Sequence, residues 1–145
     1  MQITASAVSL NVEDVAASTE FLIEHFGFRQ MLAADGFASL ARDDTAMYVV
    51  FLRRGLATLP DDQRDQHASG LILAFTVEDL DGELARLQSE GVAITMPLTV
   101  EDWGERAFQV TDPNGVLIQL MDWAARPGAP PGATIPETPS SPAAP

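Results

Sequence analysis

Residues 101–122 read EDWGERAFQVTDPNGVLIQLMD, and this stretch decides the fold. It predicts a β-hairpin that turns at residues 112–115, DPNG. Pro113 sets φ for the first turn position, the Asp112 side chain can accept a hydrogen bond from the backbone two residues further on, and Gly115 supplies a left-handed residue. The combination favours a three-residue loop with a glycine bulge. Counting outward from the bulge pairs Asp112 with Val116, Val110 with Ile118, Gln109 with Gln119, and Phe108 with Leu120.

This register separates two faces, because side chains alternate along a strand. One face is apolar enough to lie beneath helices and carries Phe108, Val110, Val116, Ile118 and Leu120. The other mixes amides with soft apolar groups and carries Ala107, Gln109, Thr111, Leu117, Gln119 and Met121. The second face either lines a ligand cavity or is half-exposed sheet surface, and the hairpin alone favours neither.

Composition narrows the class of protein. A chain of 145 residues with 46% hydrophobic and 20% charged residues is typical of one soluble globular domain. Its formal net charge of -13 repels phosphate backbones and anionic lipid, so we expect no nucleic-acid partner and no membrane surface. We find neither a long apolar run nor a basic leader, and we expect a cytoplasmic protein without a signal peptide. The lack of cysteine excludes disulfides, thiol nucleophiles and thiolate metal sites.

The chain reads as a duplicated unit. Residues 1–54 predict a strand, a helix capped by Asp14 and ended by Gly27, and three more strands. After a polar connector at residues 55–70, residues 71–125 repeat this order, with Asp79 as the cap and the opening hairpin as the last two strands. Together they predict one α+β domain of two βαβββ modules. The proline-rich residues 126–145 predict a disordered tail, either inert or a docking peptide.

The paired modules resemble the vicinal oxygen chelate superfamily, which includes glyoxalases, dioxygenases and bleomycin-resistance proteins. The resemblance rests on SLNVEDVAASTEFL at residues 9–22, on FGF at residues 26–28, and on the hairpin sequence. It implies cupped mixed sheets of the glyoxalase/bleomycin-resistance type. It also implies a homodimer with pockets at or near the subunit interface, because open sheet edges need cover.

Enzymes of that superfamily place metal ligands at matching strand positions, and here those positions hold no ionisable side chain. Ala7 and Ile72 stand seven residues before the two helix caps, Gln119 stands on the last strand, and its counterpart is near Val49. A lone amide is a poor ligand for a divalent transition metal, so we expect no metal and no other cofactor. The resemblance is therefore closest to the metal-free, bleomycin-resistance-like binders.

By strand parity, we expect the concave face to present Ser9, Asn11, Phe37, Ser39, Met47, Val49, Phe51, Ile72, Thr76, Gln109, Leu117, Gln119 and Met121. Trp103 and Arg106 are placed at its rim, although Trp103 could instead be a packing residue. Aromatic rings stack on flat ligands, thioethers adapt to irregular outlines, and amides orient a ligand through neutral hydrogen bonds. No residue is assigned a catalytic role.

The sequence is compatible with three functions. The leading hypothesis is a metal-independent protein that sequesters an aromatic or hydrophobic natural product, such as an antibiotic, for self-resistance. The second is an enzyme of the glyoxalase superfamily that works without the usual metal site or with relocated ligands. The third is a small regulatory or scaffold subunit, which the proline-rich tail favours.

Overall fold

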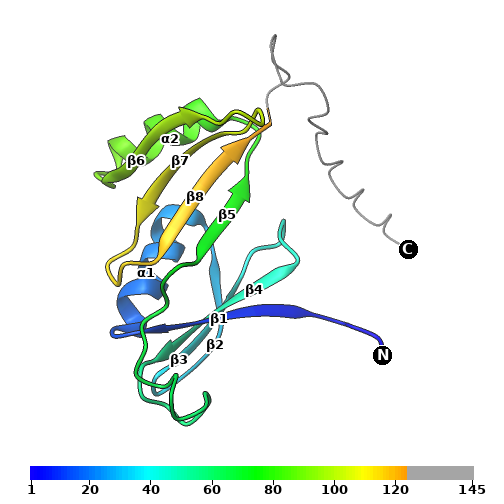
Figure 1. Ribbon diagram of the computed structural model, residues 1–145, viewed down its shortest axis with the longest axis vertical. Coiled ribbons are helices and arrows are strands. Elements are labelled where there is room, and N and C mark those ends of the chain that lie inside the picture. The colour runs from blue at the N-terminus through cyan, green and yellow to red at the C-terminus, as the bar shows by residue number, and fades with distance from the viewer. Residues whose placement is uncertain (124–145) are drawn as a thin grey trace.

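The computed structural model describes residues 1–123 and contains two βαβββ modules, as the sequence predicts (Figure 1). The first module comprises β1 (Ser6–Val12), α1 (Val15–Phe26), β2 (Arg29–Ala34), β3 (Phe37–Ala41) and β4 (Met47–Arg53). The second comprises β5 (Ile72–Thr76), α2 (Leu80–Ser89), β6 (Ile94–Val100), β7 (Arg106–Thr111) and β8 (Leu117–Asp122). Residues 126–145, for which a disordered tail was predicted, lie outside the described residues.

Both helices begin where their capping residues predict, and α1 also ends at the predicted glycine. The Asp14 carboxylate accepts a hydrogen bond from Ala17 N at 3.1 Å, and the Asp79 carboxylate accepts one from Gly82 N at 2.9 Å. Each bond satisfies a backbone donor that the first helical turn leaves free. Gly27 ends α1 in the left-handed region at φ 65°, which favours glycine because it has no Cβ.

Each module forms one mixed four-stranded sheet. Sheet A has the order β1-β4-β3-β2 and sheet B the order β5-β8-β7-β6. In each, the first strand is parallel to its neighbour, whereas the other pairs are antiparallel. The hairpin register is confirmed, since Gln109 lies opposite Gln119 and Val110 lies opposite Ile118.

The predicted facing of β4 is wrong by one residue. Val50, not Val49, lies opposite Ser9 on β1 and opposite Ser39 on β3. Val49 and Phe51 therefore belong to the helix-covered face of sheet A, where both are fully buried. Residues 49–52 read VVFL, and all four are buried, so the sequence has no polar alternation from which parity could be read.

One continuous core joins the two modules. It contains Leu10 and Phe51 from sheet A, Leu22 from α1, and Phe108 and Ile118 from sheet B, all at most 1% exposed. The helix-covered faces of both sheets thus share a core. The opposite face of each sheet, called here its open face, lies outside that core.

A second contact between the modules is polar, and we call it the clasp (Asp14, Ser18, Asp112, Asn114). The β7–β8 turn lies against the first turns of α1, where Asn114 Oδ1 accepts from Asp14 N at 3.0 Å and Asn114 Nδ2 donates to Ser18 Oγ at 2.7 Å. Ser18 Oγ in turn donates to Asp112, and both of these residues are buried. The DPNG turn therefore also joins the modules.

Among residues 1–123, neither helix is long and apolar enough to cross a membrane.

Candidate functional site

The open face of sheet B carries both glutamine side chains that are predicted to bind a ligand. The ladder places Gln109 opposite Gln119, Ala107 opposite Met121, and Ala74 of β5 opposite Gln119. Leu117 belongs to the same face and lies opposite Thr111. These positions share one face because they alternate with the buried Phe108, Val110, Ile118 and Leu120.

Four side chains on and beside this face form a chain of hydrogen bonds, called here the amide network (Trp103, Glu105, Gln109, Gln119). Gln109 Nε2 donates to Gln119 Oε1 at 2.9 Å, and Gln119 Nε2 donates to Glu105 Oε1 at 2.9 Å. The other carboxylate oxygen of Glu105 accepts from Trp103 Nε1 at 3.1 Å. The network orients the two amides and the indole relative to one another.

Trp103 lies in the loop between β6 and β7 and remains 53% exposed. Its indole N–H is occupied by Glu105, whereas half of its surface is accessible. A ring in this state can stack on a flat molecule without first breaking a packing contact in the core. The thioether of Met121 lies beside Gln119, with its sulfur 3.8 Å from Gln119 Nε2.

Glu105 is the member of the network that sequence reasoning missed. It stands two residues before Ala107 and four before Gln109, so the same parity count places it on the open face. Three other acids, Asp35, Glu101 and Asp122, lie at or just beyond the ends of strands. Asp35 pairs with Arg53 at 2.9 Å, and the Arg53 guanidinium holds the pKa of Asp35 below its ordinary value.

The predicted rim position of Arg106 is wrong, because its side chain belongs to the helix-covered face. Its guanidinium donates from Nε to Asp122 Oδ1 at 2.9 Å and from Nη1 to Asp81 Oδ2 of α2 at 3.2 Å. These two carboxylates raise the pKa of Arg106 above its ordinary value. Arg106 therefore fastens α2 to the hairpin, and its charge is already balanced.

The predicted residues of the first module do not join the amide network. Phe37, Ser39 and Asn11 lie on the open face of sheet A. Phe37 of β3 and Asn11 of β1 both lie opposite Leu52 of β4, and Ser39 lies opposite Val50. Asn11 contacts the connector at residues 55–70, where Ala68 N donates a hydrogen bond to the backbone carbonyl of Asn11 at 2.8 Å. Met47 and Phe51 lie on the opposite side of β4, Phe51 in the core and Met47 at a pocket between the modules.

The fold and the arrangement of this face permit comparison with known proteins. The family described as the Glyoxalase/Bleomycin resistance protein/Dioxygenase superfamily matches residues 4–120. The chain belongs to this superfamily. No curated protein matches the chain by sequence.

Several solved structures have a similar fold. TioX from Micromonospora sp. ML1 is 25% identical, with a TM-score of 0.65, and the match covers 84% of this chain and 100% of TioX. A glyoxalase/bleomycin resistance protein/dioxygenase from Nocardioides is 20% identical, with a TM-score of 0.67 and coverage of 88% and 89%. A lactoylglutathione lyase from Agrobacterium tumefaciens is 15% identical, with a TM-score of 0.66 and coverage of 83% and 94%. At such low identity, these matches show a shared fold, and none of them assigns an activity to this chain.

The residues at the positions where the superfamily resemblance implies metal ligands together lack the side-chain donor atoms that a metal ion would need. The strand pairings correct the predicted counterpart of Gln119 from Val49 to Val50. Ser9 of β1 lies opposite Val50, just as Ala74 of β5, its equivalent in the second module, lies opposite Gln119. The four positions are thus Ala7, Val50, Ile72 and Gln119, of which only the amide has a donor atom. Among residues 1–123, no group of three or more His, Asp or Glu side chains could hold a metal ion. This donor set does not fit a divalent transition metal.

Proposed function

We propose that this glyoxalase-superfamily protein is a metal-independent binder of small molecules. In this proposal it works in the cytoplasm and sequesters an aromatic or hydrophobic natural product, as metal-free bleomycin-resistance-like members do. The observation that supports it most is the amide network at Gln119, the position where the superfamily resemblance implies a metal-binding carboxylate. There the chain offers an amide already oriented by two neighbours, which suits hydrogen bonding to a ligand and not coordination of an ion.

The chemistry of the face suggests the kind of ligand. The half-exposed Trp103 ring offers stacking surface, and the Glu105 carboxylate beside it attracts positive charge. The formal net charge of -13 acts in the same direction. We therefore expect an aromatic ligand, with a basic amine preferred over an acid.

We further propose that two copies of the chain build the complete pocket. Large apolar side chains are exposed outside the core, including Ile72 at 44% on sheet B and Leu32 at 63% on sheet A. Because the two sheets share a core on their helix-covered faces, residues 1–123 of one chain leave both open faces uncovered. A homodimer that sets one open face against another would bury these side chains and enclose the ligand.

A fluorescence titration tests the proposed function. A Trp123→Phe background leaves Trp103 as the single tryptophan, and doxorubicin is a suitable first probe because it combines a planar ring system with an amine. We expect saturable quenching at protein concentrations where sedimentation shows a dimer. In a separate calorimetric titration, Trp103→Ala should weaken binding by about 1–3 kcal/mol.

The controls separate binding from catalysis and from metal chemistry. Gln119→Leu should weaken ligand binding, whereas Gln63→Leu, in the connector, should leave the affinity for the ligand unchanged. Chelator should have no effect on binding. Absence of saturable binding across aromatic antibiotics, or turnover that chelator abolishes, would contradict the proposal.

A further inference from the structure

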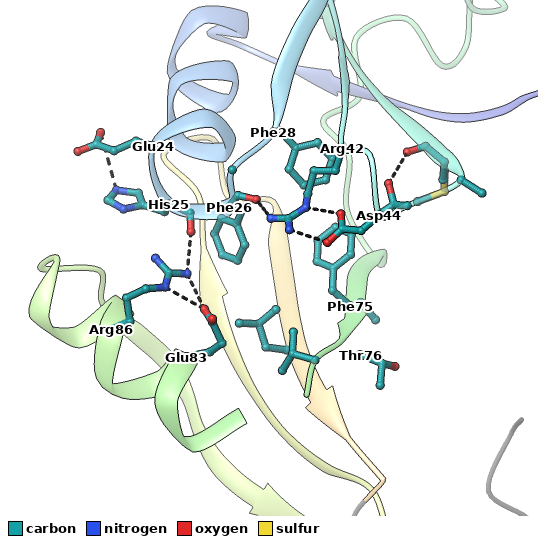
Figure 2. A pocket seen from close by; sticks show the side chains of 17 residues that line it. Glu24, His25, Phe26, Phe28, Arg42, Asp44, Phe75, Thr76, Glu83 and Arg86 are labelled. Carbon is teal, nitrogen blue, oxygen red and sulfur yellow. Dashed lines mark hydrogen bonds and ion pairs between the residues drawn. The ribbon is translucent and has the colours of Figure 1, made fainter. Parts of the chain in front are cut away.

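A cavity of about 730 Å³ lies between the modules, away from the amide network (Figure 2). Its walls come from the end of α1, the β3–β4 turn, β5 and α2. We infer that this pocket is a second ligand site, which takes a small neutral molecule carrying an aromatic ring and a secondary amide. Its volume lies within the range of small-molecule sites, and the proposed function does not use it.

The pocket exists because the modules interlock on one side only. The β7–β8 turn reaches α1, where Ser18, four residues after the cap Asp14, bonds to Asp112. The matching residue of α2 is Glu83, four residues after Asp79, and it turns instead to Arg86 at 2.6 Å. The β3–β4 turn forms no corresponding clasp with the start of α2 in the described part of the chain. The duplicated fold therefore leaves an opening where its counterpart is closed.

Paired charges surround the pocket, which argues for a neutral ligand. Arg42 binds Asp44 through two bonds of 2.7 Å and also donates to Phe26 O. Arg86 binds Glu83 and donates to His25 O at 2.9 Å. Both guanidinium groups thus bind carboxylates and the free carbonyls at the end of α1. An ionic ligand would have to break these pairs, whereas a neutral one would not.

Aromatic side chains form the apolar end of the pocket. Figure 2 shows Phe28 and Phe75 gathered with Arg42 at one end, while His25 and Arg86 lie at the other. The Phe28 and Phe75 ring centroids are 5.8 Å apart with an interplanar angle of 54°. Phe28 is buried, but Phe75 is only partly covered and leaves ring surface facing the cavity. Another aromatic ring would complete this cluster.

The edge of β5 that pairs with no strand among residues 1–123 supplies the polar recognition. Val77 N donates to Met121 O of β8 at 2.9 Å, so the N–H and C=O groups of Phe75 also point toward β8. The backbone groups of Ala74 and Thr76 alternate with these and point toward the open edge, and both residues line the pocket. A secondary amide can both donate to and accept from such an edge, as an added strand does.

The test uses N-acetyl-phenylalaninamide, a neutral molecule with one ring and a secondary amide, and the ¹⁵N-labelled full chain. We expect its titration to shift the backbone amide signals of Ala74 and Thr76 saturably, with a dissociation constant of about 1 mM or tighter. Ala74→Pro removes one N–H group at the edge of β5 but no hydrogen bond between β5 and β8. It should weaken binding of the probe about three- to tenfold. N-acetyl-glycinamide, which lacks the ring, should bind more weakly still.

Two tryptophan variants make the result independent of any effect of proline on folding. Ala46→Trp fills the mouth of the pocket from an exposed position and should abolish the shifts. Ala85→Trp, at an exposed position of α2 outside the pocket, should leave them intact. Binding that survives Ala46→Trp, or no saturable shift at all in the native chain, would overturn the inference.

The outcome can also be separated from that of the proposed function. Trp103→Ala should not alter N-acetyl-phenylalaninamide binding, because Trp103 does not line this pocket. If the Ala74 and Thr76 signals instead move with protein concentration and ignore the probe, a second copy covers the edge of β5. That result would also overturn the inference, whatever the amide network binds.

Discussion

Replacing Ser18 by alanine tests how the DPNG turn joins the modules. Ser18 is fully buried in α1, and its Oγ donates to Asp112, which is 4% exposed. The variant leaves one buried carboxylate oxygen without its donor. The other oxygen keeps its bonds from Asn114 N at 2.9 Å and Val116 N at 2.8 Å. Asn114 Nδ2 also loses Ser18 Oγ as an acceptor but keeps Asp14 O at 2.6 Å. The main loss is therefore one charge-assisted hydrogen bond between the modules.

The expected magnitude follows from two opposing effects. Loss of a hydrogen bond to a buried charge costs about 1.5–3 kcal/mol. Alanine is the better helix former by about 0.5 kcal/mol, which offsets part of that cost. The free energy of unfolding should thus fall by about 1–2.5 kcal/mol. For a domain of this size, that lowers Tm by roughly 3–10 °C.

Urea unfolding followed by circular dichroism measures the change. Ser89→Ala is the matched control, because Ser89 also lies in a helix and its Oγ donates to Arg86 O at 2.7 Å from an exposed position. We expect that control to stay within about 0.5 kcal/mol of the native chain. If Ser18→Ala unfolds at the same urea concentration as the native chain, or at a higher one, then the clasp does not stabilise the fold and this reasoning is refuted.

Two further predictions concern the end of α1. Two neighbours hold the pKa of Glu90 below its ordinary value. The larger effect comes from the hydrogen bond with His25 Nδ1, 2.7 Å from Glu90 Oε2, and the next from Arg86. A lowered pKa contributes stability above about pH 4, and this stability is lost as the pH falls through the folded-state pKa. In Glu90→Gln, the free energy of unfolding should therefore fall less between about pH 7 and pH 3 than in the native chain, as measured by urea titration at each pH. Gly27→Ala should cost about 1–2 kcal/mol by thermal unfolding, because alanine is strained at φ 65° and its Cβ would lie 3.1 Å from Arg42 Nη1; an unchanged Tm would contradict this.

Local sequence signals predict much of this fold. The DPNG turn fixes the hairpin register from Asp112 outward, because turn chemistry and strand parity agree. Asp14, Gly27 and Asp79 mark helix ends through bonds to residues close in sequence. In these places, one residue type satisfies a backbone requirement that few others can meet.

The errors arise where a residue is read without its distant neighbours. Phe51 stands in an apolar run that is buried on both faces, so its facing depends on the pairing of β4 with β1 and β3. Arg106 was placed at the rim because its pairing with Asp81 spans 25 positions and two elements. Glu105 could have been found by extending the parity count by one step. The clasp and the pocket between the modules depend on how the modules pack, which local patterns do not encode.

The proposed function depends on the claim that this glyoxalase-superfamily chain holds its ligand without a metal ion. The most direct test is elemental analysis of native protein purified without chelator, followed by calorimetric titration with zinc, nickel and manganese. Because Ala7, Val50 and Ile72 supply no donor atom, we predict no stoichiometric metal and no saturable heat of binding. About one equivalent of a tightly held divalent metal per chain, whose removal also abolishes ligand binding, would contradict the account.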